Sequence, residues 1–151
     1  MKALPVVGWR EWVEFPLWVR EPVKAKIDTG ALTSALHARK LTTFQRDGQE
    51  WARFRLSPNQ RSTAGSSTIE TRITEWRHVR SSNGKSTKRP VVDAHIRCGT
   101  RVWNIELTLV DRSQMGFRML LGRQALRRRF VVDPSHSFLA GEPVHQPEAK
   151  S

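Results

Sequence analysis

Several residue types and patterns are scarce or absent in this 151-residue sequence. It has no tyrosine, a single cysteine (Cys98) and no apolar run near the roughly 18 residues that a membrane span needs. A lone cysteine excludes an internal disulfide framework and is typical of a reducing compartment. The N-terminus carries a charge but no apolar run long enough for a signal peptide. We therefore expect a cytoplasmic protein with no membrane partner.

Acidic residues are also scarce. Asp and Glu total 14 against 26 Lys and Arg, which gives a formal net charge of +12. A field of this sign attracts polyanions, which include nucleic acid, a membrane surface and acidic peptides. A basic surface that serves only solubility is the alternative. Composition alone does not choose among these partners.

Strand patterns dominate the sequence. Residues 91–98 and 102–110 alternate apolar and polar side chains on either side of Gly99-Thr100, which predicts a hairpin. Other extended runs occupy 6–15, 22–28, 33–38, 50–56 and 69–79. A short helix is predicted over 123–129, and polar loops over 57–68 and 81–87. We predict one all-β domain over 6–141, between a flexible N-terminus (1–5) and a flexible tail (142–151).

One short motif carries a candidate catalytic group. The extended segment Val23–Ile27 ends in Asp28-Thr29-Gly30, which places a carboxylate at a strand end before a turn. Alone, this triplet is a weak signal, because an Asp that caps a turn gives the same pattern. Far downstream, 117–121 is a largely apolar run that closes on Gly122 and enters the predicted helix. The two segments together are much more specific than either one.

With both segments in place, the sequence resembles the retropepsin-like aspartic peptidases. In that family an apolar strand ends in Asp-Thr-Gly, and a later strand of two apolar residues plus Gly crosses beneath it. Segments 8–13, 24–31, 33–38 and 117–123 are similar to a bacterial subfamily that carries the label ATP-dependent zinc protease. That subfamily includes the peptidase that trims glutamate tails added to a ribosomal protein by an ATP-grasp ligase. The resemblance covers about residues 6 to 141.

The resemblance implies a fold and an assembly. It implies a closed all-β acid-protease barrel with one short C-terminal helix, and a flap hairpin over about 70–92 whose tip lies near Asn83-Gly84. Aspartic peptidases need two adjacent carboxylates that share one proton. The chain holds one Asp-Thr-Gly. The resemblance therefore implies a two-fold homodimer that pairs Asp28 with its symmetry mate.

The resemblance also implies site residues and a substrate. Asp28, Thr29 and Gly30 are the predicted catalytic residues, and an acidic peptide such as a glutamate-tailed ribosomal protein is the predicted substrate. The predicted substrate-binding residues are Ala31, Arg80, Lys85, Lys88 and Arg123. Viral retropepsins have an Asp where this chain has Leu32, so we expect Arg123 to lack that partner. An ATP-grasp ligase is the expected pathway partner.

Other catalytic systems find little support in the residues. His95 and Cys98 lie three apart on a predicted strand and point to opposite faces, so no metal site is predicted. Gly84-Lys85-Ser86 matches only the end of a phosphate loop, and no cofactor is predicted. Cys98 lies on the apolar face of its strand and is expected in the core. His37 follows the motif, where a structural role is favoured over one in the cleft.

A binding module without catalysis is the second hypothesis. A basic β-domain of this charge could dock on RNA or the ribosome through Arg127–Arg129 and the 85–89 segment. The sequence shows no aromatic pattern of the kind that an RNA-recognition sheet carries. We therefore rank this hypothesis below the peptidase.

Overall fold

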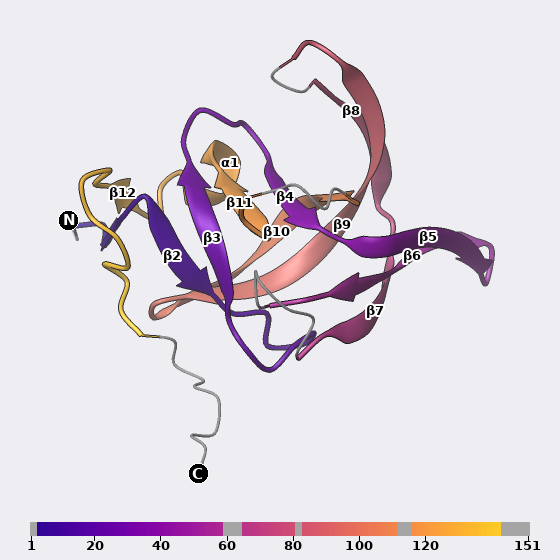
Figure 1. The fold of residues 1–151 in the computed structure, drawn as a ribbon, viewed down its shortest axis with the longest axis horizontal. Coiled ribbons are helices and arrows are strands. Elements are labelled where there is room, and N and C mark those ends of the chain that lie inside the picture. Colours follow the sequence, from indigo (N-terminus) through magenta and orange to yellow (C-terminus); the bar gives the residue numbers. More distant parts are fainter. Residues whose placement is uncertain (1–2, 59–64, 81–82, 112–115, 143–151) are drawn as a thin grey trace.

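The structure, a computed structural model, describes residues 3–58, 65–80, 83–111 and 116–142. Its regular structure is almost entirely β-strand, with one short helix, α1 (Arg123–Leu126), so the all-β prediction is confirmed (Figure 1). The helix is shorter than the predicted 123–129, because Arg127 has ψ 130° and Arg128 has φ 68°, neither of which is helical. Of the predicted flexible tail, 143–151 lie outside the described residues.

The main sheet has seven strands in the order β2-β3-β11-β4-β10-β9-β8. In that order the strands are β2 (Arg10–Val13), β3 (Val23–Asp28), β11 (Met119–Gly122), β4 (Ser34–His37), β10 (Arg101–Val110), β9 (Ser86–Cys98) and β8 (Glu75–Arg80). The hairpin predicted from 91–98 and 102–110 is the β9–β10 pair. Edge strands β2 and β8 do not pair with each other, and the β2 side meets β9 only through an isolated Glu14–Arg97 bridge. The predicted closed barrel is therefore wrong, and the sheet is open.

Strand β11 runs between two strands from the first third of the chain. It is parallel to β3, with Leu121 opposite Ile27 and Gly122 opposite Asp28, and antiparallel to β4. This arrangement brings the two motifs together, although about 90 residues of chain separate them.

A second sheet of three strands, β5 (Arg39–Arg46), β6 (Gln49–Leu56) and β7 (Ser67–Arg72), extends to the right in Figure 1. Strand β5 was not among the predicted strands, because 39–46 has few apolar residues and no alternation that favours burial of one face. The predicted strand 69–79 divides between β7 and β8. Between them, the amide of Ile73 donates to Glu50 O and that of Thr74 to Val91 O, so the chain changes sheets there.

The N-terminal strand prediction, 6–15, also divides. Strand β1 (Val6–Val7) pairs in parallel with β12 (Val131–Val132), and β2 begins after Gly8. A Cβ on Gly8 would lie 2.1 Å from the carbonyl oxygen of His136, so only glycine allows this approach.

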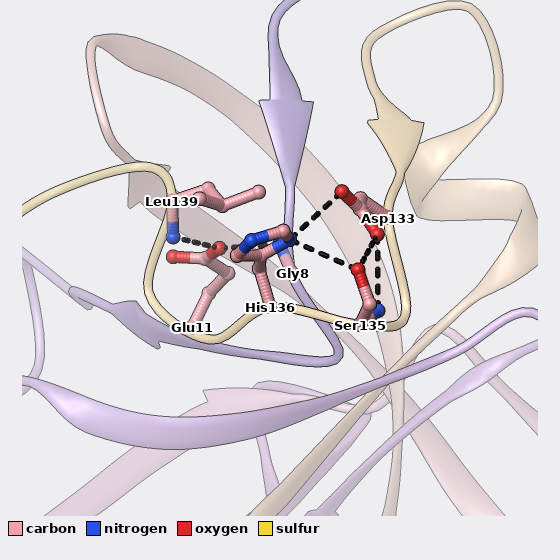
Figure 2. Close-up of polar contacts among 6 residues, drawn as sticks. All are labelled: Gly8, Glu11, Asp133, Ser135, His136 and Leu139. Carbon is pink, nitrogen blue, oxygen red and sulfur yellow. Dashed lines mark hydrogen bonds and ion pairs between the residues drawn. The ribbon is translucent and has the colours of Figure 1, made fainter.

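A buried carboxylate holds the C-terminal segment against the N-terminal strands. Glu11 is 0% exposed, and its carboxylate accepts hydrogen bonds from the backbone amides of Gly8 (2.6 Å), Leu139 (2.8 Å) and Ala140 (3.1 Å). Figure 2 shows Glu11 beside Gly8 and Leu139, next to the turn that carries Asp133, Ser135 and His136. Three donors around one carboxylate compensate much of the cost of burying its charge.

His37 is buried at the end of β4, 2% exposed, and its amide donates to Arg118 O. Burial, followed by the positive charge of Arg118, lowers the pKa of its imidazole below the usual 6.5. The structural role favoured from the sequence fits this buried position.

The pH dependence of stability tests the buried neutral state of His37. Below pH 6.5 the unfolded chain takes up a proton that the folded chain does not, so the free energy of unfolding falls as the pH falls. We expect urea denaturation between pH 7.5 and 5.5 to show a steeper loss for the wild type than for His37→Gln. The difference is at most about 1.4 kcal/mol per pH unit. The exposed His78→Gln should keep the wild-type slope, and an identical slope in His37→Gln would contradict this account.

Candidate active site

The loop after β3 presents the predicted catalytic carboxylate. Asp28 ends the strand half-buried, whereas Thr29 and Gly30 are exposed. The Gly30 amide donates to Asp28 Oδ1 (3.1 Å), and the Ala31 amide donates to the Asp28 carbonyl (3.2 Å). The loop therefore orients the carboxylate through its own backbone while its tip stays accessible.

Strand β11 and the start of α1 support this loop from below. The Arg123 amide donates to Ala31 O (2.8 Å), and the Gln124 amide donates to Leu32 O (3.0 Å). The Arg123 guanidinium also donates from Nη1 to the Thr29 carbonyl (2.8 Å). Because Leu32 stands where viral retropepsins have an Asp, Arg123 is predicted to lack that carboxylate partner. The structure instead gives it a backbone carbonyl within the Asp-Thr-Gly triplet.

Gly122 is the tightest contact of this region. A Cβ there would lie 2.3 Å from Thr33 O and 3.0 Å from Ala31 O, which leaves no room for any other residue. Ser34 is buried beside it, and its Oγ accepts the Gly122 amide (2.9 Å). The Ser34 carbonyl in turn accepts Thr108 Oγ1 (3.2 Å). Ser34 is not among the predicted site residues, although a hydroxyl one residue into the short predicted strand 33–38 could have indicated a buried hydrogen bond.

The face of the sheet that carries Asp28 is open. In β3 the side chains of Val23, Ala25 and Ile27 are buried, so those of Lys26 and Asp28 lie on the opposite face. In the same register, Lys26 pairs with Leu120, and Leu120 pairs with Ala35. None of these three is buried. A cation and two small or apolar side chains therefore share the face of the candidate carboxylate.

Two large apolar side chains are exposed near the loop. Leu32 is 47% exposed and lies four residues after Asp28. Trp9 is 36% exposed, and its carbonyl accepts the amide of Ile27, the residue before Asp28. The Trp9 ring also contacts Phe117 edge-on, with 5.9 Å between ring centroids.

The β8–β9 hairpin carries three of the predicted substrate-binding residues. Arg80 ends β8, Lys85 precedes β9, and Lys88 lies on β9 with its Nζ 5.6 Å from the centre of the Trp76 ring. All three are exposed. At the tip, residues 81–82 lie outside the described residues, and the Lys85 amide donates to Asn83 Oδ1 (3.0 Å). The structure thus places Asp28, Thr29, Gly30, Ala31 and Arg123 together and these three cations on a separate hairpin.

Two basic residues within the segment predicted as the flap, about 70–92, have other positions or contacts. Arg72 lies on β7, in the second sheet. Arg77 lies on β8 but forms ion pairs with Glu75 and Glu106, so part of its charge is already compensated.

The residues considered for other chemistries lie elsewhere. Cys98 is buried, and burial followed by the charge of Glu11 raises the pKa of its thiol to about 12. The Nδ1 of His95 lies 2.7 Å from Asn104 Oδ1. Within the described residues no group of three or more His, Cys, Asp or Glu could hold a metal ion. Over the same part of the chain, no helix is long and apolar enough to cross a membrane.

Comparison with known proteins identifies the family. A model described as the retropepsin-like aspartic endopeptidase RimB, of the RimB-like family, matches residues 6–143. The chain belongs to the RimB-like family. The resemblance inferred from the Asp28 and Gly122 segments is therefore confirmed.

Relatives of this RimB-like chain include longer proteins. It is 42% identical over 137 residues to a probable alpha-L-glutamate ligase of Shewanella pealeana, and 39% identical over 140 residues to one of Desulfotalea psychrophila. These matches take in 91% and 93% of this chain. The chain spans only 30% of the length of each of these curated relatives.

A solved structure shares the fold. The crystal structure of Lpg0085, a protein with unknown function from Legionella pneumophila, superposes with a TM-score of 0.74 and 27% sequence identity. The match covers 91% of this chain and 99% of that one. The overall fold of this chain is thus shared with a crystal structure.

The close packing around Gly122 predicts the effect of adding one methyl group. Gly122→Ala drives a Cβ into Thr33 O and separates β11 from the Asp28 loop, so we expect a loss of about 2–3 kcal/mol in the free energy of unfolding. Urea denaturation measures this loss. Gly116→Ala is the matched control, because a Cβ there meets nothing within 4 Å. Equal stability of the two variants would show that the contact is not tight.

Proposed function

We propose that this chain is an aspartic-type peptidase that hydrolyses acidic peptides, with α-linked glutamate tails on a ribosomal protein as the substrate. The observation that carries the proposal is the pairing of Gly122 with Asp28, which supports an exposed Asp-Thr-Gly loop on the frame of an aspartic endopeptidase family. Asp28, Thr29 and Gly30 are the proposed catalytic residues.

The chemistry needs a second carboxylate close to Asp28. In the proposed homodimer, Asp28 of a second copy supplies it, and the two share one proton because adjacent charges do not both remain ionised. The ionised carboxylate takes a proton from water as the water oxygen bonds to the scissile carbonyl carbon. The protonated carboxylate gives its proton to the carbonyl oxygen. The carboxyl that took the proton from water then protonates the leaving nitrogen while the other carboxylate takes a proton from a hydroxyl of the tetrahedral intermediate, and the C–N bond breaks.

Two features of the loop support a dimer. The loop tip is exposed, so a second copy can approach Asp28 directly. Leu32, four residues after Asp28, is a large exposed apolar side chain, and its burial would stabilise the association.

Cations near the loop support an acidic substrate. Lys26 lies two residues before Asp28 on the same open face, where its ammonium can pair with a substrate carboxylate. Arg80, Lys85 and Lys88 add positive charge on the β8–β9 hairpin, which is the proposed flap. Arg123 holds the loop through the Thr29 carbonyl, and Ala31 borders it.

The names of the relatives support the substrate class. The part of those proteins that matches this chain covers only 30% of their length, and they are named probable alpha-L-glutamate ligases. A peptidase segment and a glutamate ligase in one chain would act on the same kind of bond in opposite directions. We therefore propose a glutamate ligase as the pathway partner of this chain. We also propose the cytoplasm as its location.

Loss of the carboxylate tests the catalytic assignment. Asp28→Asn removes the group that takes the proton from water, so we expect at least a thousandfold lower cleavage rate. The measurement is release of glutamate or short oligomers from a Glu-tailed peptide, followed by mass spectrometry. Asp133→Asn is a matched control, because Asp133 is a half-buried carboxylate, as Asp28 is, and lies in the turn before Ser135. Full activity of Asp28→Asn would show that Asp28 is not a catalytic residue. A strict monomer in sedimentation would contradict the proposed pair of Asp28 carboxylates.

Loss of the positive charge of Lys26 tests the substrate assignment. We expect Lys26→Gln to raise KM for a Glu-tailed peptide about tenfold, because one charge-assisted hydrogen bond is lost, while kcat changes little. The matched control is Lys24→Gln, which removes an equal charge from the same strand, where Lys24 Nζ lies 5.7 Å from the centre of the Trp12 ring. A Gln-tailed peptide should show no difference between wild type and Lys26→Gln. An unchanged KM for the Glu-tailed peptide would show that Lys26 does not contact the substrate.

A further inference from the structure

The second sheet has one buried and one exposed face. Ala52, Phe54, Leu56 and Ile69 fill the core from one side. The residues that alternate with them stand on the other side in one continuous register, so that Phe44 pairs with Trp51 and Trp51 with Arg72. We call this side the arginine–aromatic face, and it is defined by Phe44, Arg46, Trp51, Arg53, Arg55 and Arg72.

The aromatic rings and guanidinium groups of this face form one stack. The rings of Phe44 and Trp51 lie side by side, with centroids 6.4 Å apart and planes at 27°. The Arg46 guanidinium lies 4.7 Å from the Trp51 ring centre and 5.0 Å from that of Phe44. The Arg53 guanidinium lies 4.8 Å from the Phe44 ring centre. Planar cationic groups are thus held against aromatic planes at the surface.

The face carries a strong positive charge. Four arginines stand on it, and Glu70 is the one acid among the strand residues in this register. Glu70 accepts from both Arg46 (2.9 Å) and Arg53 (2.7 Å). Those two side chains still keep 43% and 50% of their surface exposed. Glu70 therefore orients the two guanidiniums and offsets one charge of four.

We propose that the arginine–aromatic face binds single-stranded nucleic acid. Phosphates would pair with the guanidiniums, and bases would stack on the guanidinium and ring planes, as on other single-strand platforms. A polyglutamate chain offers carboxylates but no planar groups, so it would use the charge of this face and leave the rings unused. A second copy of the same face would meet like charge.

This surface is separate from the candidate active site. In Figure 1 the second sheet extends to the right, whereas the loop that joins β3 to β4 lies at the upper left. Nucleic acid on the face would therefore leave the Asp28 loop open. The binding proposal does not depend on peptidase activity.

Fluorescence anisotropy with labelled 10-nucleotide oligo-U tests the proposal. Arg46→Gln/Arg53→Gln should weaken binding at least tenfold at 150 mM salt, and should lower the slope of log K against log salt by about two. Phe44→Leu keeps the apolar volume but removes the ring, and should weaken binding about tenfold with the salt slope unchanged. Oligo-dT of the same length shows whether the site distinguishes RNA from DNA.

Lys24→Gln/Arg101→Gln is the matched control, because it removes two charges from strands β3 and β10 of the main sheet, outside the arginine–aromatic face. It should keep affinity within about threefold of the wild type. Thermal unfolding verifies that every variant is folded. Equal losses in both double variants would show that only the overall charge attracts the oligonucleotide. Tighter binding of a Glu₁₀ peptide than of oligo-U to this face, or no saturable binding of either oligonucleotide, would also overturn the proposal.

Discussion

The pairing of Gly122 with Asp28 is the constraint on which the rest of this structure depends. Strand β11 reaches Asp28 only because Gly122 has no Cβ, since the Thr33 carbonyl occupies the space that a side chain would need. Once β11 is in place, Ser34 Oγ accepts the Gly122 amide, and the amides of Arg123 and Gln124 and the Arg123 guanidinium donate to carbonyls of the loop. The start of α1 thus holds the loop, and the Gly30 amide orients the carboxylate, which is how an exposed loop can hold a defined shape.

The positive charges of this chain are distributed unevenly: some are paired with acids, and others lie on separate surfaces. Some cations already have partners: Arg77 pairs with two glutamates, and Arg46 and Arg53 share Glu70. Lys26 lies beside Asp28, whereas the arginine–aromatic face is on another sheet. The proposed peptide site and the proposed nucleic-acid face therefore lie on different sheets.

Agreement between sequence and structure follows the strength of the local signal. The β9–β10 hairpin was predictable, because alternation and Gly99-Thr100 act over a few residues. The short helix was predicted too long, since its end depends on the backbone at Arg127 and Arg128 rather than on composition. Strand β5 was missed, because its residues are mostly polar and it is stabilised by pairing with β6. The sequence showed no aromatic pattern for the same reason, since Phe44 and Trp51 meet only through the pairing of β5 with β6.

The sequence alone determined the family and the candidate carboxylate, because the Asp28 segment and the Gly122 segment each carry specific residues within a few positions. It also determined the net charge and the all-β class, which are sums over the whole chain. Tertiary structure decided that the sheet stays open, that Arg123 bonds to the Thr29 carbonyl, and that Lys26 shares a face with Asp28. These depend on strand order and register between distant segments, and no local pattern encodes which carbonyl a distant guanidinium will meet.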